Sequence, residues 1–372
     1  YADVDRIARL VPTKLHITLD EAVNTTPELK EIYESDVKIK HLVDTAKHLE
    51  GITRHSSTHA AGFVISKDRL DDVVPLQKPI GGDDHGATMT QYAMEPIAAL
   101  GLLKLDFLGL SNLTVLSKTR DLISQTQGIE VTPNNISLND SKAFELLAQG
   151  ETVGVFQLES SGMSRYIKEL KPTSIGDVSA MIALYRPGPM EHITTFIEAK
   201  HGQVKPKYPH DALKDILEET YGVIVYQDQV LLITQTFAGY SLGEADIVRK
   251  AMGKKIPEIM KQENEKFLLG ALEQGYSREL SEEIFSLIEP FAGYAFNKAH
   301  SVSYGLISYW TAYLKANYTV EYMASLLNTY LGNTEKVSTA IAECRRLNIP
   351  VLSPDINRSQ IGFALETLED QK

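Results

Sequence analysis

The sequence predicts a mostly helical α+β protein in which a small sheet region lies between a short helical segment and a long helical one. Helix-start signals recur over residues 18–51 and again from about residue 111 onward. Between them, two short apolar runs bounded by glycines have the length and composition of strands. A chain of 372 residues is long enough for about two or three domains, each with its own core.

The composition excludes several classes of protein. A chain that is 43% hydrophobic and 23% charged is not globally disordered. The single cysteine, Cys344, cannot form an internal disulfide or a cysteine metal cluster, and it favours a reducing compartment. No apolar run approaches the ~20 residues that span a bilayer. The chain begins with Tyr1 and no basic-then-apolar leader follows, so we expect a piece of a longer chain.

The net charge of −12 does not exclude a nucleic-acid binder, because phosphate contacts depend on local clusters and not on the sum. Residues 290–320 contain no Asp or Glu, yet they carry Lys298 and Lys315 and are rich in aromatic residues. This segment is a local exception in an acidic protein and needs its own explanation.

Three short helices are expected before residue 52. Thr18–Glu21 is a capping box, and Thr26–Glu28 places a cap, a proline at the first helical position and an acid in the first turn. A third helix is expected over Asp36–Glu50, ending at Gly51 in the left-handed conformation.

Two buried strands are expected next, at Gly62–Ser66 and within Gly101–Gly109, with Pro75, Pro79 and the run 81–84 marking the loops between them. Because side chains alternate along a strand, Lys104 and Asp106 share one face. One interpretation is a metal-binding carboxylate beside a phosphate-binding ammonium, since magnesium needs only one or two carboxylates plus substrate phosphates. The alternative is a surface face that carries a weak ion pair.

The long helical segment contains two further clusters. Its clearest helix starts are 173–174, 241–244 and 256–258. One cluster lies at the end of the helix that starts at 241, where Gly253 leaves room for a polyanion beside four cations: Arg249, Lys250, Lys254 and Lys255. Cations at a helix C-terminus are also favoured by the dipole alone.

The second cluster precedes or begins a helix that runs through Lys315, and it consists of Tyr294, Asn297, Lys298 and His300. A helix N-terminus beside Lys and His suits an anion, and a tyrosine offers a face for a base to stack on. A purely structural histidine is the alternative. Three shorter stretches are also unusual: the polar run Arg54–His59, the turn Arg186–Pro189 and the segment Phe156–Ser160.

Taken together, these segments resemble the bacterial replicative DNA polymerase III alpha subunit, from near residue 3 to about residue 357. The matching blocks occur in the family's order, at 54–66, 103–110, 156–163, 186–189, 221–230, 245–255 and 291–304. The resemblance implies part of the thumb at 1–55, the last part of the palm at 56–110, with a small mixed sheet, and helical fingers at 111–372. The family's upstream pair of metal-binding aspartates has no counterpart, since Pro354–Asn357 lacks the second aspartate and lies at the wrong end, so a fragment is implied.

The resemblance also implies roles for individual residues. Asp106 would bind metal and Lys104 would contact phosphate. Arg54, His59 and Arg186 would bind DNA, the first two at the junction of thumb and palm. The remaining candidates would lie near the incoming nucleotide: Arg249, Lys250, Lys254, Lys255, Tyr294, Asn297, Lys298 and His300.

The implied activity is templated DNA synthesis, in which a primer 3′-hydroxyl attacks the α-phosphate of a deoxynucleoside triphosphate with two magnesium ions. The expected partners are primer–template DNA and nucleotides, with the sliding clamp and other replisome subunits contacted through regions outside this chain. The expected setting is the cytoplasm, away from membranes. Because the segment carries only one of the family's metal-binding carboxylates, it is expected to have no polymerase activity alone. The alternative function is a non-catalytic helical module for nucleic-acid binding or assembly.

Overall fold

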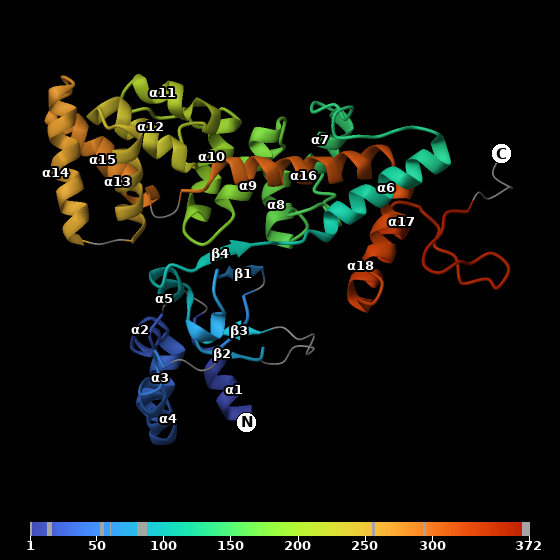
Figure 1. The fold of residues 1–372 in the computed structure, drawn as a ribbon, viewed down its shortest axis with the longest axis horizontal. Helices are drawn as coiled ribbons and strands as arrows, with labels where there is room; N and C mark the ends of the chain where they lie inside the picture. The colour runs from blue at the N-terminus through green and yellow to red at the C-terminus, as the bar shows by residue number, and fades with distance from the viewer. Residues whose placement is uncertain are drawn as a thin grey trace. The chain divides into compact units, whose positions relative to one another are not determined.

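The computed structural model describes residues 2–12, 17–52, 56–59, 61–79, 88–254, 257–292 and 295–366. They divide into two compact units, which we call unit 1 (Tyr1–Gly109) and unit 2 (Leu110–Lys372) and describe separately. Helices dominate both units and the strands are few and short (Figure 1). The predicted mostly helical α+β class is therefore confirmed.

Unit 1 begins with four helices: α1 (Ala2–Arg9), α2 (Leu19–Thr25), α3 (Pro27–Ser35) and α4 (Val37–Lys47). The predicted cap of α2 is present, since the Thr18 hydroxyl accepts a hydrogen bond from the Glu21 amide at 3.1 Å. The helices bury a small apolar cluster made of Ile7, Ala22, Val23, Leu29 and Val43. Helix α4 ends at Lys47, earlier than predicted, because a turn follows before Gly51 takes its positive φ of 76°.

The strands of unit 1 form two separate antiparallel pairs. Strand β1 (Gly62–Ile65) pairs with β4 (Leu103–Asp106), and β2 (Leu76–Gln77) pairs with β3 (Met89–Thr90). Between them lie the short helices η1 (Leu70–Asp72) and α5 (Met94–Ala99). Among the described residues the expected mixed sheet is thus wrong, because no parallel strand joins either pair.

The prediction that both strands are buried is also wrong. Phe63 on β1 and Leu103 on β4 are each 58% exposed, and Phe107 just after β4 is 65% exposed. Phe63 and Phe107 pack edge to face with ring centroids 5.9 Å apart, but no described element covers their face. An apolar run bounded by glycines predicts a strand correctly, but it does not tell whether a second layer covers the strand.

The regular elements of unit 2 are all helices in its described residues, apart from one isolated parallel bridge between Tyr226 and Phe296. Its elements are α6 (Ser111–Gln127), α7 (Ser141–Ala148), α8 (Ser161–Leu170), α9 (Ile175–Leu184), η2 (Pro189–His192), α10 (Ile193–Lys200), α11 (Ala212–Leu217), η3 (Glu218–Thr220), α12 (Gln227–Ala238), α13 (Leu242–Lys254), α14 (Pro257–Glu273), α15 (Arg278–Ala292), α16 (Lys298–Asn317), α17 (Thr319–Thr329) and α18 (Thr334–Arg346). No described helix has the length and apolar character needed to cross a membrane.

Local signals fix where these helices begin. At α9, Ser174 and Asp177 form a reciprocal capping box. At α13, the Glu244 carboxylate accepts from the Ser241 amide at 3.0 Å and from its hydroxyl at 2.8 Å. These hydrogen bonds lower the pKa of Glu244 to about 2. The predicted helix starts are confirmed at both positions.

Helix α16 is the central element of unit 2. It packs against α9, α7 and α6 (Figure 1). Tyr309 and Leu314 join the core with α6, α17 and α18, whereas Ala312 joins the core with α7, α8 and α9. At Gly305 the approach to α9 is so close that an added Cβ would lie 2.3 Å from the Ser179 hydroxyl.

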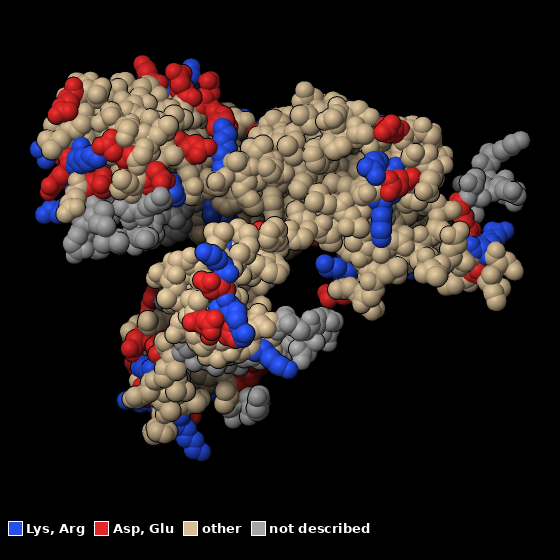
Figure 2. All heavy atoms as spheres, viewed as in Figure 1, with Lys and Arg blue, Asp and Glu red and all other residues tan. Residues whose placement is uncertain are grey.

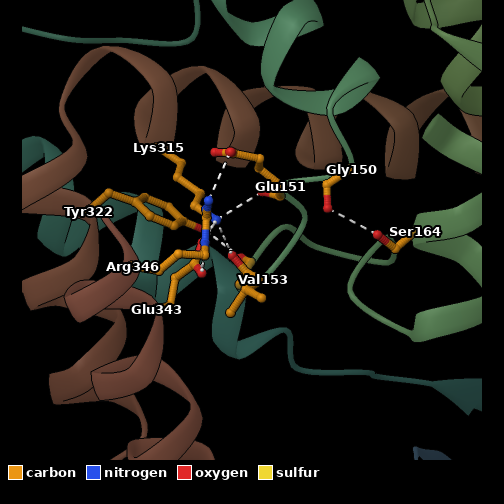
Figure 3. Close-up of polar contacts among 9 residues, drawn as sticks. Gly150, Glu151, Val153, Ser164, Lys315, Tyr322, Glu343 and Arg346 are labelled. Atoms are coloured by element: carbon orange, nitrogen blue, oxygen red, sulfur yellow. Dashed lines mark hydrogen bonds and ion pairs between the residues drawn. The ribbon is translucent and has the colours of Figure 1, made fainter. Parts of the chain in front are cut away.

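A buried ion pair anchors the end of α16 (Figure 3). The Lys315 ammonium donates to the backbone carbonyls of Glu151 and Val153 at 2.9 Å each and to a Glu343 carboxylate oxygen at 2.6 Å. Arg346 donates to both oxygens of Glu343, at 2.8 and 2.9 Å, and to Glu151 at 2.9 Å. Because every charged group here has a partner, the network holds α16, α18 and the turn at 151–153 together.

Candidate functional site

In unit 1, strand β4 places Lys104 and Asp106 on one face, as predicted. The Lys104 ammonium donates to both carboxylate oxygens of Asp106, at 2.7 and 3.0 Å. This hydrogen bond lowers the pKa of Asp106, so the carboxylate is ionised at neutral pH. The Asp106 side chain is 54% exposed, which leaves it accessible to a ligand.

His59 lies beside this pair. Its Nδ1 accepts hydrogen bonds from the backbone amides of Gly62 at 2.8 Å and Ala61 at 3.2 Å. These hydrogen bonds hold the ring in place and leave Nε2 as its remaining polar atom. Nδ1 also lies 3.7 Å from a carboxylate oxygen of Asp106. At Gly62, an added Cβ would lie 2.8 Å from Lys104 Cε and 3.0 Å from His59 Nδ1, so a larger residue there would require these side chains to shift.

This face of β4 offers one of the ligands that a hard cation such as magnesium needs. A carboxylate oxygen such as that of Asp106 is a ligand that magnesium prefers, whereas a neutral imidazole is not. Within the described residues, no group of three His, Cys, Asp or Glu side chains could hold a metal ion. The described part of the chain thus offers one suitable ligand and not a complete site.

In unit 2, residues 295–300 are held in place by backbone hydrogen bonds. The Phe296 amide donates to the Val225 carbonyl at 2.9 Å, and the Gln227 amide donates to the Phe296 carbonyl at 2.9 Å. The Asn297 side chain then caps α16 by accepting from the His300 amide at 3.0 Å. The start of α16 is therefore fixed against the start of α12.

A row of aromatic rings extends from this point, and we call it the aromatic column. The Arg186 guanidinium lies over the Phe296 ring at 4.4 Å. The Phe296 ring is 5.5 Å from that of His300, and the His300 ring is 4.2 Å from that of Tyr304. Phe156 completes the column, 5.1 Å from Tyr304. Two predicted residues far apart in the sequence, Arg186 and His300, are thus brought together.

Lys298 is engaged by a carboxylate. Its ammonium donates to both oxygens of Glu219, at 2.6 and 2.8 Å, and lies 5.5 Å over the Tyr226 ring. Lys298 and Glu219 border an open pocket of about 660 Å³ whose lining also includes Glu218 and Asp228. An anion can use Lys298 only after Glu219 releases it.

The other predicted cations are placed as follows. Arg249 on α13 donates to one oxygen of Asp246 at 2.9 and 2.7 Å. Figure 2 shows basic and acidic side chains interspersed over the end of unit 2 that contains α11–α15. Helix α13 includes the backbone of Lys250 and Lys254, but their side chains are not among those that the structure describes. The other predicted residues, Arg54, Lys255 and Tyr294, lie wholly outside the described residues.

Sequence reasoning missed Glu219 and the roles of Phe156, Phe296 and Tyr304. The segment that begins at Phe156 is unusual in the sequence, but its ring contact with Tyr304 joins residues that lie about 150 positions apart. Glu219 carries no local signal, because its partner Lys298 lies 79 positions away.

Comparison with known proteins gives one consistent result. Residues 1–109 match the family model of the bacterial DNA polymerase III alpha NTPase domain, and residues 112–275 match that of the bacterial DNA polymerase III alpha subunit finger domain. The chain is 47% identical over 366 residues to the DNA polymerase III subunit alpha of Thermus aquaticus, covering 96% of this chain and 30% of that protein.

Other relatives agree. The DNA polymerase III subunit alpha of Bacillus subtilis is 44% identical over 364 residues, covering 98% of this chain and 32% of the relative. That of Borreliella burgdorferi is 46% identical over 359 residues, covering 96% and 31%. The chain therefore spans about a third of the length of these curated relatives.

Proposed function

Because the chain belongs to the bacterial DNA polymerase III alpha subunit family, we propose that it takes part in templated DNA synthesis. In that reaction a nucleotide is transferred from a deoxynucleoside triphosphate to a primer 3′-hydroxyl. The observation that best supports the proposal is the aromatic column of unit 2, with Arg186 at one end and His300 within it. His300 is the exposed ring of the column, and an aromatic face can stack on a nucleobase while a guanidinium pairs with phosphate, so His300 and Arg186 suit a nucleotide ligand.

We assign the segments accordingly. Residues 1–55 would form part of the thumb, 56–110 the last part of the palm and 111–372 the fingers. The palm would carry the ligand for a metal, and the fingers would carry the contacts to the nucleotide. The partners would be primer–template DNA and deoxynucleoside triphosphates, with other replisome subunits contacted outside this chain and the cytoplasm as the setting.

In the proposed reaction, Asp106 supplies one carboxylate ligand for Mg²⁺. Two such ions, when bound, would neutralise charge on the attacking and leaving oxygens. The low pKa of Asp106 keeps this carboxylate ionised and ready to bind a cation. Lys104 neutralises it in the free protein and could move to a substrate phosphate when a metal takes its place, because the Asp106 side chain is 54% exposed and that of Lys104 is 24% exposed.

The residues of unit 2 would position the nucleotide. Asn297 fixes the start of α16, so its first amides and His300 are held ready for an anion. Lys298 would leave Glu219 to contact a phosphate. Positioning and neutralisation of charge supply most of the catalysis in phosphoryl transfer, so no side chain of this segment needs to act as a nucleophile.

Primer extension by a full-length alpha subunit that carries this segment tests the proposal. We expect Arg186→Ala and His300→Ala each to raise the KM for deoxynucleoside triphosphates by about tenfold, as loss of one charged or stacking contact does. Asn348→Ala, on an exposed residue after α18, serves as the control. Unchanged kinetics in both variants would contradict the assignment of unit 2 as the nucleotide-binding part.

The isolated 372-residue chain gives a second test. With one metal ligand in the described residues, it should bind labelled primer–template DNA but incorporate no nucleotide. Incorporation by the purified chain, free of other polymerases, would contradict this expectation. If the Asp106→Ala substitution in the full-length subunit left extension intact, the alternative of a non-catalytic binding module would be favoured.

A further inference from the structure

Gln157 has a backbone conformation that its residue type rarely adopts. Its φ angle is +63°, in the left-handed region that favours glycine. It lies in a tight turn in which the Leu158 amide donates to the Val155 carbonyl at 3.1 Å. A residue other than glycine in this region stores strain, and it persists only where the surroundings impose it.

The surroundings impose this turn from both sides. Phe156 and Leu158, on either side of Gln157, are 7% and 0% exposed. The Phe156 amide donates to the Thr311 hydroxyl at 3.1 Å, and the Tyr322 hydroxyl donates to the Gly154 carbonyl at 2.6 Å. The backbone therefore has no freedom to relax, and a glycine at position 157 would satisfy it with less strain.

The Gln157 side chain does not explain why glutamine stands there. It is exposed, and its side-chain amide forms no hydrogen bond with another described residue. An exposed amide without a partner contributes nothing evident to the fold, so the strained residue needs a reason outside the fold.

The position of Gln157 suggests that reason. It directly follows Phe156, the last ring of the aromatic column, which packs on Tyr304 at 5.1 Å. Tyr304 in turn packs on His300 at 4.2 Å. The turn that holds Gln157 is thus fixed to the same helix face that carries the proposed nucleotide contacts.

We propose that Gln157 is a further nucleotide-contacting residue, which hydrogen-bonds the edge of a base or a sugar hydroxyl. A neutral amide both donates and accepts, and this matches bases and sugars better than phosphate, which Arg and Lys bind. The inference rests on the proposed function of unit 2. The nucleotide is either the incoming triphosphate or a residue of the primer–template, and the experiment distinguishes these two sources.

The test is Gln157→Gly in a full-length alpha subunit that carries this segment. Glycine removes the amide and also relieves the positive φ, so folding and function should respond in opposite directions. We expect the Tm of the 372-residue chain to stay the same or rise. We expect the KM for deoxynucleoside triphosphates or the Kd for primer–template DNA to rise about two- to tenfold, as for one lost hydrogen bond.

The matched control is Asn348→Gly. Asn348 is also an exposed amide residue with positive φ, at +58°, just after α18. This variant loses an amide and relieves strain in the same way, but it should leave both the KM and the Kd unchanged.

Each result of this experiment leads to a different conclusion about Gln157. A rise confined to the KM assigns Gln157 to the incoming nucleotide, and a rise in the Kd for DNA assigns it to the primer–template. Unchanged constants, an equal loss in Asn348→Gly, or a lowered Tm in Gln157→Gly would overturn the inference. A wild-type subunit that extends no primer would overturn the proposed function instead.

Discussion

Two lysine–carboxylate pairs of nearly equal length have opposite surroundings in this protein. Lys104 and Asp106 in unit 1 lie 2.7 Å apart, and Lys315 and Glu343 in unit 2 lie 2.6 Å apart. The side chains of Lys104 and Asp106 are 24% and 54% exposed, whereas that of Glu343 is 4% exposed and that of Lys315 is fully buried. Distance alone therefore says little about what an ion pair does.

The difference in burial changes how each pair responds to a competing ligand. Burial lowers the pKa of Lys315, although Glu343 opposes this effect. Burial also raises the pKa of Glu343, but Arg346 and Lys315 outweigh it, so the net shift is downward. Removing one partner of the buried pair would leave the other charge buried without its counter-ion. Water and ions can replace either partner of the exposed pair, which makes it suited to exchange.

A third pair is about as exposed as the first. Lys298 and Glu219 are 37% and 48% exposed and 2.6 Å apart. If exposure decides whether a pair is structural or exchangeable, breaking either exposed pair should act on function, and breaking the buried pair should act on stability.

The largest effect is expected from Asp106→Ala in the full-length subunit. Primer extension should fall by about 10³-fold or more if Asp106 binds a catalytic Mg²⁺ as proposed, since loss of this ligand weakens binding of the ion that would neutralise charge in the transition state. The free energy of unfolding and the Kd for primer–template DNA should hardly change, because the pair is exposed. Rapid-quench primer extension measures the loss of activity, and urea unfolding measures the free energy of unfolding.

Asp71→Ala is the control for this variant. Asp71 pairs with Arg69 two positions away, in the same unit, and its side chain is 50% exposed. It should retain full activity. Extension by Asp106→Ala at the Asp71→Ala rate would show that the exposed pair has no catalytic role.

Lys315→Met should act on stability. It leaves the Glu343 carboxylate buried with one partner fewer, so the free energy of unfolding should fall by about 3–5 kcal/mol. Urea unfolding of the 372-residue chain measures this change. The double variant Lys315→Met/Glu343→Met should recover most of the loss, because it removes the stranded charge as well. A single variant as stable as the wild type would contradict the structural role of the network.

Lys298→Met should have a smaller effect, on function. If Lys298 contacts a phosphate as proposed, its loss should raise the KM for deoxynucleoside triphosphates by about tenfold and leave the Tm nearly unchanged. Lys266→Met is the control, since Lys266 also pairs with a glutamate, at 3.1 Å and with similar exposure. A fall in Tm without a change in KM would place this pair with the structural ones.

Glu219→Gln should give the smallest change, and in the opposite direction. It frees Lys298 from its carboxylate and removes one negative charge from the pocket, so the KM should fall about two- to threefold at low salt. Glu282→Gln, which breaks an exposed pair with Arg278, should leave the KM unchanged. A raised KM in Glu219→Gln would mean that Glu219 itself positions the lysine for the nucleotide.

The parts of the structure that depend on neighbouring residues could be predicted from the sequence. The caps formed by Thr18 and Ser241 could be predicted, because their partners lie three positions away. The shared face of Lys104 and Asp106 follows from the alternation of a strand. These contacts need no knowledge of the tertiary fold.

Contacts between distant segments could not be predicted in this way. Arg186 over Phe296 and Lys298 with Glu219 each depend on how helices pack. The exposure of Phe63 was also hidden, because an apolar run does not reveal whether a second layer covers it. The positive φ of Gln157 carries no sequence signal, since glutamine gives no hint of a left-handed turn.

The most direct test of the claim that the exposed pair exchanges its lysine for a metal is Mn²⁺ binding, followed by electron paramagnetic resonance of the free ion. The full-length subunit should bind Mn²⁺ at least about tenfold more weakly after Asp106→Asn, as expected for loss of a carboxylate ligand. The Asp71→Asn variant should match the wild type. Equal Mn²⁺ affinity in the wild type and in Asp106→Asn would contradict the claim.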